Sequence, residues 1–137
     1  MTWVGGTWWE LKLAPGWRAQ DDPECLTVTK SSDGAFQLSA ALKSAGPIAP
    51  EEIADFYRET VPPGATFDTA SFGVFAGYSS HYVDGDAYWH KFWLCHDSLL
   101  VFATYNGTAD AWRSEGEEVR GMLNSLRVRQ LETGASK

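Results

Sequence analysis

The sequence predicts an α+β fold in which one six-stranded antiparallel sheet is flanked by two main helices. Three observations lead to this prediction. Residues 71–106 hold three apolar runs separated by the short turn segments VDGD and HDS, which is typical of a three-stranded antiparallel meander. Both faces of this meander are apolar, so each face needs a cover. Helical patterns precede and follow the meander, and a helix on each face would supply those covers.

The chain before residue 50 is predicted to contain three strands. Residues 8–13 (WWELKL) alternate between apolar and polar side chains, and the segment Ala14-Pro15-Gly16 then turns the chain. Residues 25–30 and 35–41 flank the loop SSDG, where Gly34 is expected to need a left-handed backbone. Residues 20–24 (QDDPE) and 44–50 (SAGPIAP) are interpreted as connections, because they are polar or rich in proline and glycine.

The two helices have recognisable starts. Residues 50–60 begin with a proline at the first helical position, and Ile53, Phe56 and Tyr57 lie on one stripe. A second helix, capped by Thr108 or Asp110, is predicted to run to about residue 125. Its inward stripe consists of Trp112, Glu115, Val119, Met122, Leu123 and Leu126.

The turns of the meander predict its register. A two-residue turn at Asp84-Gly85 would pair Val74 with Cys95 and Ala76 with Trp93, and a turn at Asp97-Ser98 would pair Trp93 with Phe102. Side chains alternate across a strand, so each strand contributes to both faces. One predicted face contains Phe72, Val74, Ala76, Trp93, Cys95, Leu100 and Phe102, and the other contains Phe75, Phe92, Leu94, Leu99, Val101 and Ala103.

Length and charge restrict the function. A chain of 137 residues with 44% hydrophobic content fits one domain, which we place at residues 1–128, followed by a polar C-terminal tail at residues 129–137. The net charge of −7 repels phosphate backbones and anionic lipids, so we expect neither nucleic-acid binding nor membrane insertion. The N-terminus lacks a signal-peptide pattern and no run is long enough to span a membrane, which predicts a soluble cytoplasmic protein.

No catalytic residue, cofactor or metal site is predicted. Cys25 and Cys95 lie on separate predicted strands without CxxC spacing, so unpaired thiols are favoured, and a disulfide would require neighbouring strands. His90 and His96 are six residues apart on one strand, roughly 20 Å, so they cannot share one ion with His81. A two-ligand site at His81 and His90, placed diagonally at about 7–8 Å, stays open if a carboxylate assists.

Aromatic residues are the strongest compositional signal. The chain has seven tryptophans, seven phenylalanines and five tyrosines, and tyrosine and tryptophan are enriched at protein interfaces. The assumed register places several of them, with Lys91, on one face near the Asp84-Gly85 turn. The candidate partner-binding residues are Tyr78, Tyr82, Trp89 and Lys91, with Trp8 and Trp112 as further members. They would form a partner-binding patch or the mouth of an apolar pocket. The alternative is that these rings cover the edge of the sheet or lie under the N-terminal segment.

Three short segments carry a resemblance to a known group. LKLAPGW at residues 11–17, FATYN at 102–106 and LNSLRV at 123–128 resemble the PsbP-like group, in which a strand runs into a P-G-W turn and a late helix ends in an S-L segment. That group includes Ran-binding Mog proteins, the photosystem protein PsbP, DcrB-type lipoproteins and the Eag chaperones of type VI secretion. The resemblance implies a PsbP-like sandwich of helices around an antiparallel sheet. It also implies roles in binding and assembly, without common catalytic residues.

These observations together favour a noncatalytic protein-binding module over an enzyme. We expect a chaperone, adaptor or immunity-type protein, with an association to secretion among the options. Its partner would be another protein or a second copy of the chain. The alternative is a small-molecule-binding protein or an enzyme that uses a pocket between the sheet and the helices.

Overall fold

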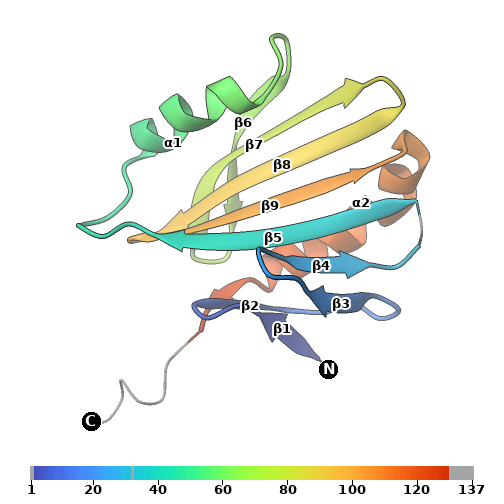
Figure 1. Cartoon of the computed structure of the whole chain (residues 1–137), viewed down its shortest axis with the longest axis horizontal. Helices are drawn as coiled ribbons and strands as arrows, with labels where there is room; N and C mark the ends of the chain where they lie inside the picture. The colour runs from blue at the N-terminus through green and yellow to red at the C-terminus, as the bar shows by residue number, and fades with distance from the viewer. Residues whose placement is uncertain (1, 32, 130–137) are drawn as a thin grey trace.

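The computed structural model describes residues 2–31 and 33–129 and consists of ten strands, two α-helices and one 3-10 helix (Figure 1). The elements before the meander are β1 (Trp3–Gly5), β2 (Trp9–Lys12), β3 (Arg18–Asp21), β4 (Leu26–Thr29), β5 (Gly34–Leu42), α1 (Pro50–Tyr57) and the 3-10 helix η1 (Arg58–Thr60). They are followed by β6 (Thr66–Phe72), β7 (Phe75–Asp84), β8 (Ala87–His96), β9 (Leu99–Gly107), α2 (Ala109–Asn124) and β10 (Arg127–Val128). The α+β class and both predicted helices are confirmed, whereas the strand count is not.

The strands form two sheets, so the prediction of one six-stranded sheet is wrong. A seven-stranded antiparallel sheet has the order β3-β4-β5-β9-β8-β7-β6, and a three-stranded sheet has the order β1-β2-β10. The first strand, predicted at residues 8–13, is β2 at residues 9–12 and belongs to the small sheet, which lies below the large one in Figure 1. The additional strands were missed because β1 and β10 are very short, and because β3, taken in part as a polar loop, is exposed along its whole length.

The two hairpins of the meander differ in how well their register was predicted. The pairing of Trp93 with Phe102 across β8 and β9 is confirmed. Between β7 and β8 the register is shifted by two residues, because Asp84 pairs with Ala87 and the loop is Gly85-Asp86. Gly85 has a φ of 63°, which places the glycine at the first loop position, as a type II′ turn requires. A shift of two residues keeps the two faces of each strand unchanged.

The start of the meander is a hairpin that the sequence did not reveal. Residues 72 and 74 were expected on one strand and one face, but a turn at Gly73, with a φ of 62°, separates β6 from β7. Val74 is therefore in the turn and 60% exposed. Phe72 packs edge-on against Phe92 on the opposite face, with ring centroids 5.8 Å apart. The predicted positions of Phe72 and Val74 are thus both wrong.

A helix packs on each face of the large sheet, as the two-sided apolar pattern predicted. On one face, Val119, Met122 and Leu123 of α2 enter the main core, which includes Phe36, Phe92, Leu94 and Val101 of the sheet. The hydroxyl of Thr108 accepts a hydrogen bond from the Ala111 N–H at 3.0 Å and caps this helix. On the other face, Ile53 and Tyr57 of α1 form a smaller core with Trp93, packed by Phe67, Tyr78, Cys95, Leu100 and Phe102. The side chain of Phe56, expected on the same stripe, lies outside the described part of the chain.

Gly34 has a different role from the one expected. It lies within β5 without a positive φ, and a Cβ at this position would overlap the Tyr105 hydroxyl. Close packing, and not a left-handed turn, requires glycine here. Cys25 and Cys95 are unpaired: Cys25 immediately precedes β4, Cys95 lies on β8, and β5 and β9 separate these two strands.

At the end of the described chain, the Arg129 N–H donates to the Trp8 carbonyl at 2.8 Å. Residue 129, predicted to start the tail, is thus still bound to the small sheet, and residues 130–137 lie outside the described part. No helix in the described residues is both long and apolar enough to cross a membrane.

Gly77 provides a test of the β7–β8 register. Its Cβ would overlap the Trp93 carbonyl, so Gly77→Ala is expected to lower the free energy of unfolding by about 1–3 kcal/mol. Gly121→Ala is the matched control, because its Cβ would meet no atom within 4 Å. That change in α2 should instead raise stability by about 0.5–1 kcal/mol. Urea denaturation followed by circular dichroism measures both effects, and equal effects of the two substitutions would contradict the register.

Candidate functional site

The structure brings four of the six predicted partner-binding residues to one face and separates the other two. Tyr78 and Tyr82 of β7 share the α1 side of the large sheet with Trp89 and Lys91 of β8. Trp112 belongs to α2 and packs on the opposite face of that sheet, 5.4 Å from the ring of Tyr88 and 5.0 Å from that of Tyr105. Trp8 is half-buried against the main core beside the small sheet.

Three of these side chains, Tyr82, Trp89 and Lys91, contact one another, and Lys91 also contacts η1. Tyr82 and Trp89 are direct cross-strand partners whose rings stack with centroids 6.4 Å apart. The Lys91 ammonium lies 5.4 Å from the Tyr82 ring and 5.5 Å from the Trp89 ring, within cation–π range. The same ammonium donates to the Thr60 carbonyl at 3.1 Å and so ties the β7–β8 hairpin to the end of η1. These rings are therefore partly occupied by contacts within the chain.

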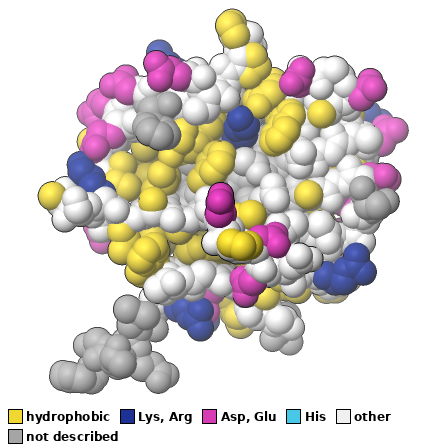
Figure 2. All heavy atoms as spheres, viewed as in Figure 1, with side chains coloured by type: hydrophobic (Ala, Val, Ile, Leu, Met, Phe, Trp, Pro, Cys, Tyr) yellow, Lys and Arg dark blue, Asp and Glu magenta, His cyan; other side chains and the backbone are white. Residues whose placement is uncertain are grey.

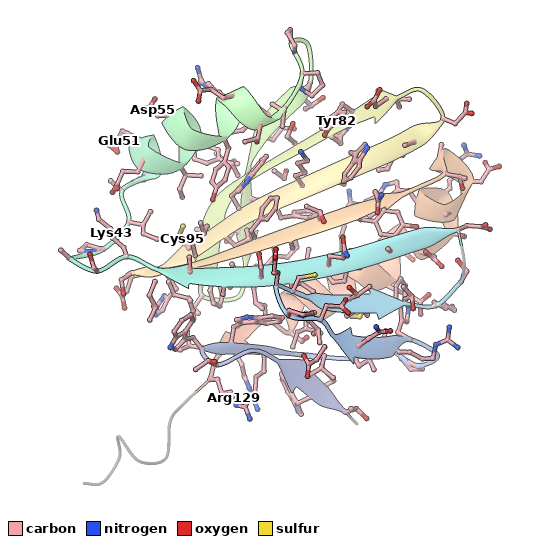
Figure 3. All side chains as sticks on the ribbon, viewed as in Figure 1. Lys43, Glu51, Asp55, Tyr82, Cys95 and Arg129 are labelled. Atoms are coloured by element: carbon pink, nitrogen blue, oxygen red, sulfur yellow. The ribbon has the colours of Figure 1, made fainter. Side chains whose placement is uncertain are left out.

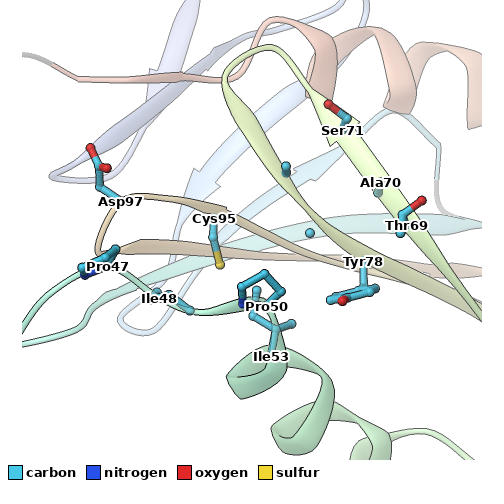
Figure 4. Close-up of a pocket in the computed structure, with 12 residues that line it drawn as sticks. Pro47, Ile48, Pro50, Ile53, Thr69, Ala70, Ser71, Tyr78, Cys95 and Asp97 are labelled. Carbon is cyan, nitrogen blue, oxygen red and sulfur yellow. The ribbon is translucent and has the colours of Figure 1, made fainter.

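Tyr78 lies instead in an open apolar groove, which we call the β6 groove. This cavity of about 630 Å³ runs between the N-terminal half of α1 and strands β6–β8. Figure 4 shows Tyr78 and Cys95 directed toward Pro50 and Ile53 of α1. The remaining lining residues are Pro47, Ile48, Thr69, Ala70, Ser71, Ala76, Gly77 and Asp97.

A second groove lies on the other side of the same helix, and we call it the β5 groove. It has a volume of about 300 Å³. It is lined by Ala41, Leu42, Lys43, Ile48, Glu52, Ile53, Tyr57 and Leu100. Ile48 and Ile53 border both grooves, so the two cavities flank one apolar ridge.

Local structure explains why the grooves exist. The connection before α1 is bound to the β8–β9 turn, since Ile48 N–H donates to the Asp97 carbonyl at 2.9 Å and Lys43 N–H to the Ser98 carbonyl at 2.8 Å. This places Ile48 beside the start of α1. With eight residues, α1 is only about 12 Å long, so it covers part of a face formed by strands of up to 10 residues.

The N-terminus of α1 is firmly held. Glu52 accepts hydrogen bonds at 2.8 Å from both the Lys43 ammonium and the Ala49 N–H. These two bonds, with that from Lys43 the stronger influence, keep the pKa of Glu52 below its ordinary value. The ridge between the two grooves is thereby fixed in position.

Cys95 is the thiol in the β6 groove, and its chemistry is that of a neutral group. Burial, with a smaller contribution from Glu52, raises the pKa of Cys95 to about 11. The thiolate is the reactive form of cysteine, so this side chain is a poor nucleophile near pH 7. It contributes to the groove as a small apolar side chain.

The histidines form no shared site in the described residues. His81 and His90 are direct cross-strand partners with ring centroids 5.3 Å apart, closer than predicted because of the register shift. The His90 ring stacks on Phe92 at 4.4 Å and lies 4.9 Å from Trp112, and its Nδ1 is 3.1 Å from the Tyr88 hydroxyl. Burial is the main cause that lowers the pKa of His90 to about 3. No group of three or more metal-binding side chains occurs among residues 2–31 and 33–129.

Glu115, the carboxylate on the predicted apolar stripe of α2, is buried and 4% exposed. It accepts hydrogen bonds from the Tyr105 hydroxyl at 2.7 Å and the Ser31 hydroxyl at 2.8 Å. Burial, followed by the bond to Glu115, raises the pKa of Tyr105. The network joins α2 to β9 and to the β4–β5 loop, which is a structural role for a buried polar group.

The sequence interpretation missed the groove residues Leu42, Ile48, Ile53 and Leu100 as a possible site. The available signal was Ile48, an isolated apolar residue in the proline-rich connection SAGPIAP. A connection on the surface does not normally need such a side chain unless it packs against something.

Comparisons with known proteins inform the fold alone. No protein-family model and no curated protein matches the chain. Among solved structures, the fold is similar to that of a protein from Bacteroides thetaiotaomicron VPI-5482, with a TM-score of 0.62 and 12% sequence identity. The match covers 91% of this chain but only 46% of the Bacteroides chain, so this chain spans about half the length of that protein.

Proposed function

We propose that the chain is a noncatalytic protein-binding module that engages its partner through the two grooves beside α1. The observation that carries this proposal is the open apolar surface on both sides of the ridge formed by Ile48 and Ile53. Figure 2 shows apolar side chains gathered on this side of the molecule. Leu42, which lines the β5 groove, is 46% exposed. Apolar surface that remains accessible in a folded domain marks sites of association.

Within this class, we propose a cytoplasmic chaperone, adaptor or immunity-type protein. The PsbP-like resemblance of residues 11–17, 102–106 and 123–128 supports a binding or assembly role, and it stays a prediction. The chemistry of the grooves agrees with a noncatalytic role, because the Cys95 thiol in the β6 groove is held in its neutral form.

One observation favours a second candidate function, the binding of a small apolar molecule. The β6 groove, at about 630 Å³, lies within the roughly 300–1,000 Å³ range of small-molecule pockets. A small ligand is best enclosed by its pocket, whereas this groove is open to solvent and a second apolar groove lies on the other side of the ridge formed by Ile48 and Ile53. A longer, protein-like occupant therefore fits the surface better.

The proposal is tested by comparing partners recovered from the native host with three tagged proteins. They are the wild type, Ile48→Glu on the ridge, and Val83→Glu as a matched control at a 66% exposed position on the β7–β8 hairpin. We expect a partner that binds the wild type and the Val83→Glu protein, and whose Kd for purified Ile48→Glu is at least tenfold higher. Circular dichroism confirms that each variant is folded. Recovery of the same proteins, with equal affinity, by all three would contradict the proposal.

A further inference from the structure

We infer that the partner presents a cationic amphipathic segment, whose apolar side chains enter the two grooves and whose basic side chains meet the acidic rim. This inference rests on the proposed function, because it specifies the chemistry of the partner at the same surface. Two independent features carry it: the paired grooves and the sign of the charge around them.

The elements around the grooves are acidic overall. Residues 43–61, the β8–β9 turn and the α1-facing side chain of Lys91 carry five carboxylates and three cations, Lys43, Arg58 and Lys91. The carboxylates are Glu51, Glu52, Asp55, Glu59 and Asp97, of which Glu52 and Asp97 line the grooves. In Figure 3, Glu51 and Asp55 lie on the outer side of α1, away from the sheet. The surface is therefore negative where a partner would approach.

Contacts within the chain neutralise little of this charge. Lys43 pairs with Glu52 at 2.8 Å, while the Arg58 guanidinium lies 5.9 Å from the ring of Phe67. Glu51 and Asp55 are exposed and have no ion-pair partner among the described residues. Opposite charges on a partner would complement them, increase the association rate and disfavour wrong partners.

The shape of the surface selects an amphipathic segment. A ridge with an apolar groove on each side accepts side chains that project from one face of a helix at i, i+3, i+4 and i+7. The charged residues of such a segment then lie beside the grooves and not in them. A segment with apolar anchors and lysine or arginine between them satisfies both features.

Charge also argues against the other occupants of this surface. A second copy of the chain would bring a net charge of −7 and the same acidic rim, so two copies repel each other here. Phosphate backbones and anionic lipids are repelled for the same reason. A cationic protein segment is the occupant that the charge favours.

The test uses two fluorescein-labelled 16-residue peptides, one an amphipathic repeat of leucine and lysine and the other identical except for glutamate in place of lysine. Fluorescence anisotropy at low salt should show a Kd at least tenfold lower for the lysine peptide. Raising the salt to 0.5 M should weaken its binding severalfold, because exposed charges are screened.

Matched variants separate binding at the grooves from attraction by total charge. Glu51→Lys with Asp55→Lys should raise the Kd of the lysine peptide at least tenfold. Glu24→Lys with Glu117→Lys changes the net charge equally at exposed positions in the β3–β4 loop and on α2, and should change the Kd less than threefold. Equal weakening by both pairs would overturn the inference, and so would no binding of the lysine peptide.

The remaining outcomes distinguish this inference from the proposed function. If both peptides bind equally and Ile48→Glu abolishes both, the groove binds protein segments but the preference for cations is wrong. If the neutral dye Nile red binds the groove and neither peptide displaces it, the site takes small molecules and the inference fails. The partner comparison with Ile48→Glu and Val83→Glu decides the proposed function separately.

Discussion

Replacing Trp93 with alanine is expected to lower the free energy of unfolding by about 3–5 kcal/mol. Trp93 is 0% exposed and lies at the centre of the smaller core, under α1. Its ring stacks on Tyr57 with centroids 4.5 Å apart, and the rings of Phe67 and Phe102 both lie at 5.8 Å. Truncation removes a large buried side chain and leaves a cavity that the rigid strands on either side cannot fill. The thermal midpoint should fall by on the order of 10–20 °C.

Trp89→Ala is the matched control for this prediction. Trp89 lies on the same strand and the same face but is half-exposed, so its loss should cost much less than that of Trp93. Trp93→Phe adds a second comparison, because the Trp93 Nε1 has no hydrogen-bond partner among the described residues. Phenylalanine keeps an aromatic ring and removes that unpaired donor. Trp93→Phe should therefore lower the free energy of unfolding less than Trp93→Ala does. If Trp93→Ala and Trp89→Ala lowered the free energy of unfolding equally, Trp93 would not lie in a core buried under α1.

Stability is expected to fall as the pH decreases from about 6.5 to about 3, with His90 as the cause. Burial lowers the pKa of His90 from 6.5 to about 3 in the folded protein. Above pH 6.5, His90 is neutral in both the folded and unfolded states and contributes no pH dependence. Between these two values only the unfolded state binds the proton, so acidification favours unfolding by about 1.4 kcal/mol per pH unit.

His90→Phe isolates this effect. Phenylalanine preserves stacking against Phe92 and Trp112, whose rings lie 4.4 Å and 4.9 Å from that of His90. The free energy of unfolding of His90→Phe minus that of the wild type should be about 3 kcal/mol larger at pH 4.5 than at pH 7.5. Phe92→Leu is the control, because it loosens the same aromatic cluster but retains His90, so its stability curve should run parallel to that of the wild type. Urea denaturation at several pH values measures these differences, and parallel curves for the wild type and His90→Phe would contradict the assignment.

The elements predicted well are those whose signals are local. Pro50 and the acidic residues that follow it mark the start of α1, and Thr108 caps α2 as one of two predicted caps. The β8–β9 register also follows from its own turn at Asp97-Ser98. The β7–β8 register was wrong by two residues because either Asp84-Gly85 or Gly85-Asp86 could form the turn, and only the backbone conformation of Gly85 distinguishes them.

The candidate site was predicted less well than the fold. The sequence pattern placed Tyr78, Tyr82, Trp89 and Lys91 on one face, and the structure agrees. It could not show that Lys91 reaches the Thr60 carbonyl, 31 residues away along the chain, or that Trp112 lies behind the sheet. Contacts of this kind depend on how α1, η1 and α2 dock, which no periodicity within a single segment reports.

The sequence by itself determined the α+β class, the two helices, and a meander that is apolar on both faces. Periodicity and turn chemistry are properties of neighbouring residues, so these features can be read without knowing the fold. Only the tertiary structure decided that the strands divide between two sheets, and that α1 covers its face incompletely and leaves a groove on each side. Pairing and coverage depend on segments that are distant in sequence, and the shape left between them emerges only when all of them pack together.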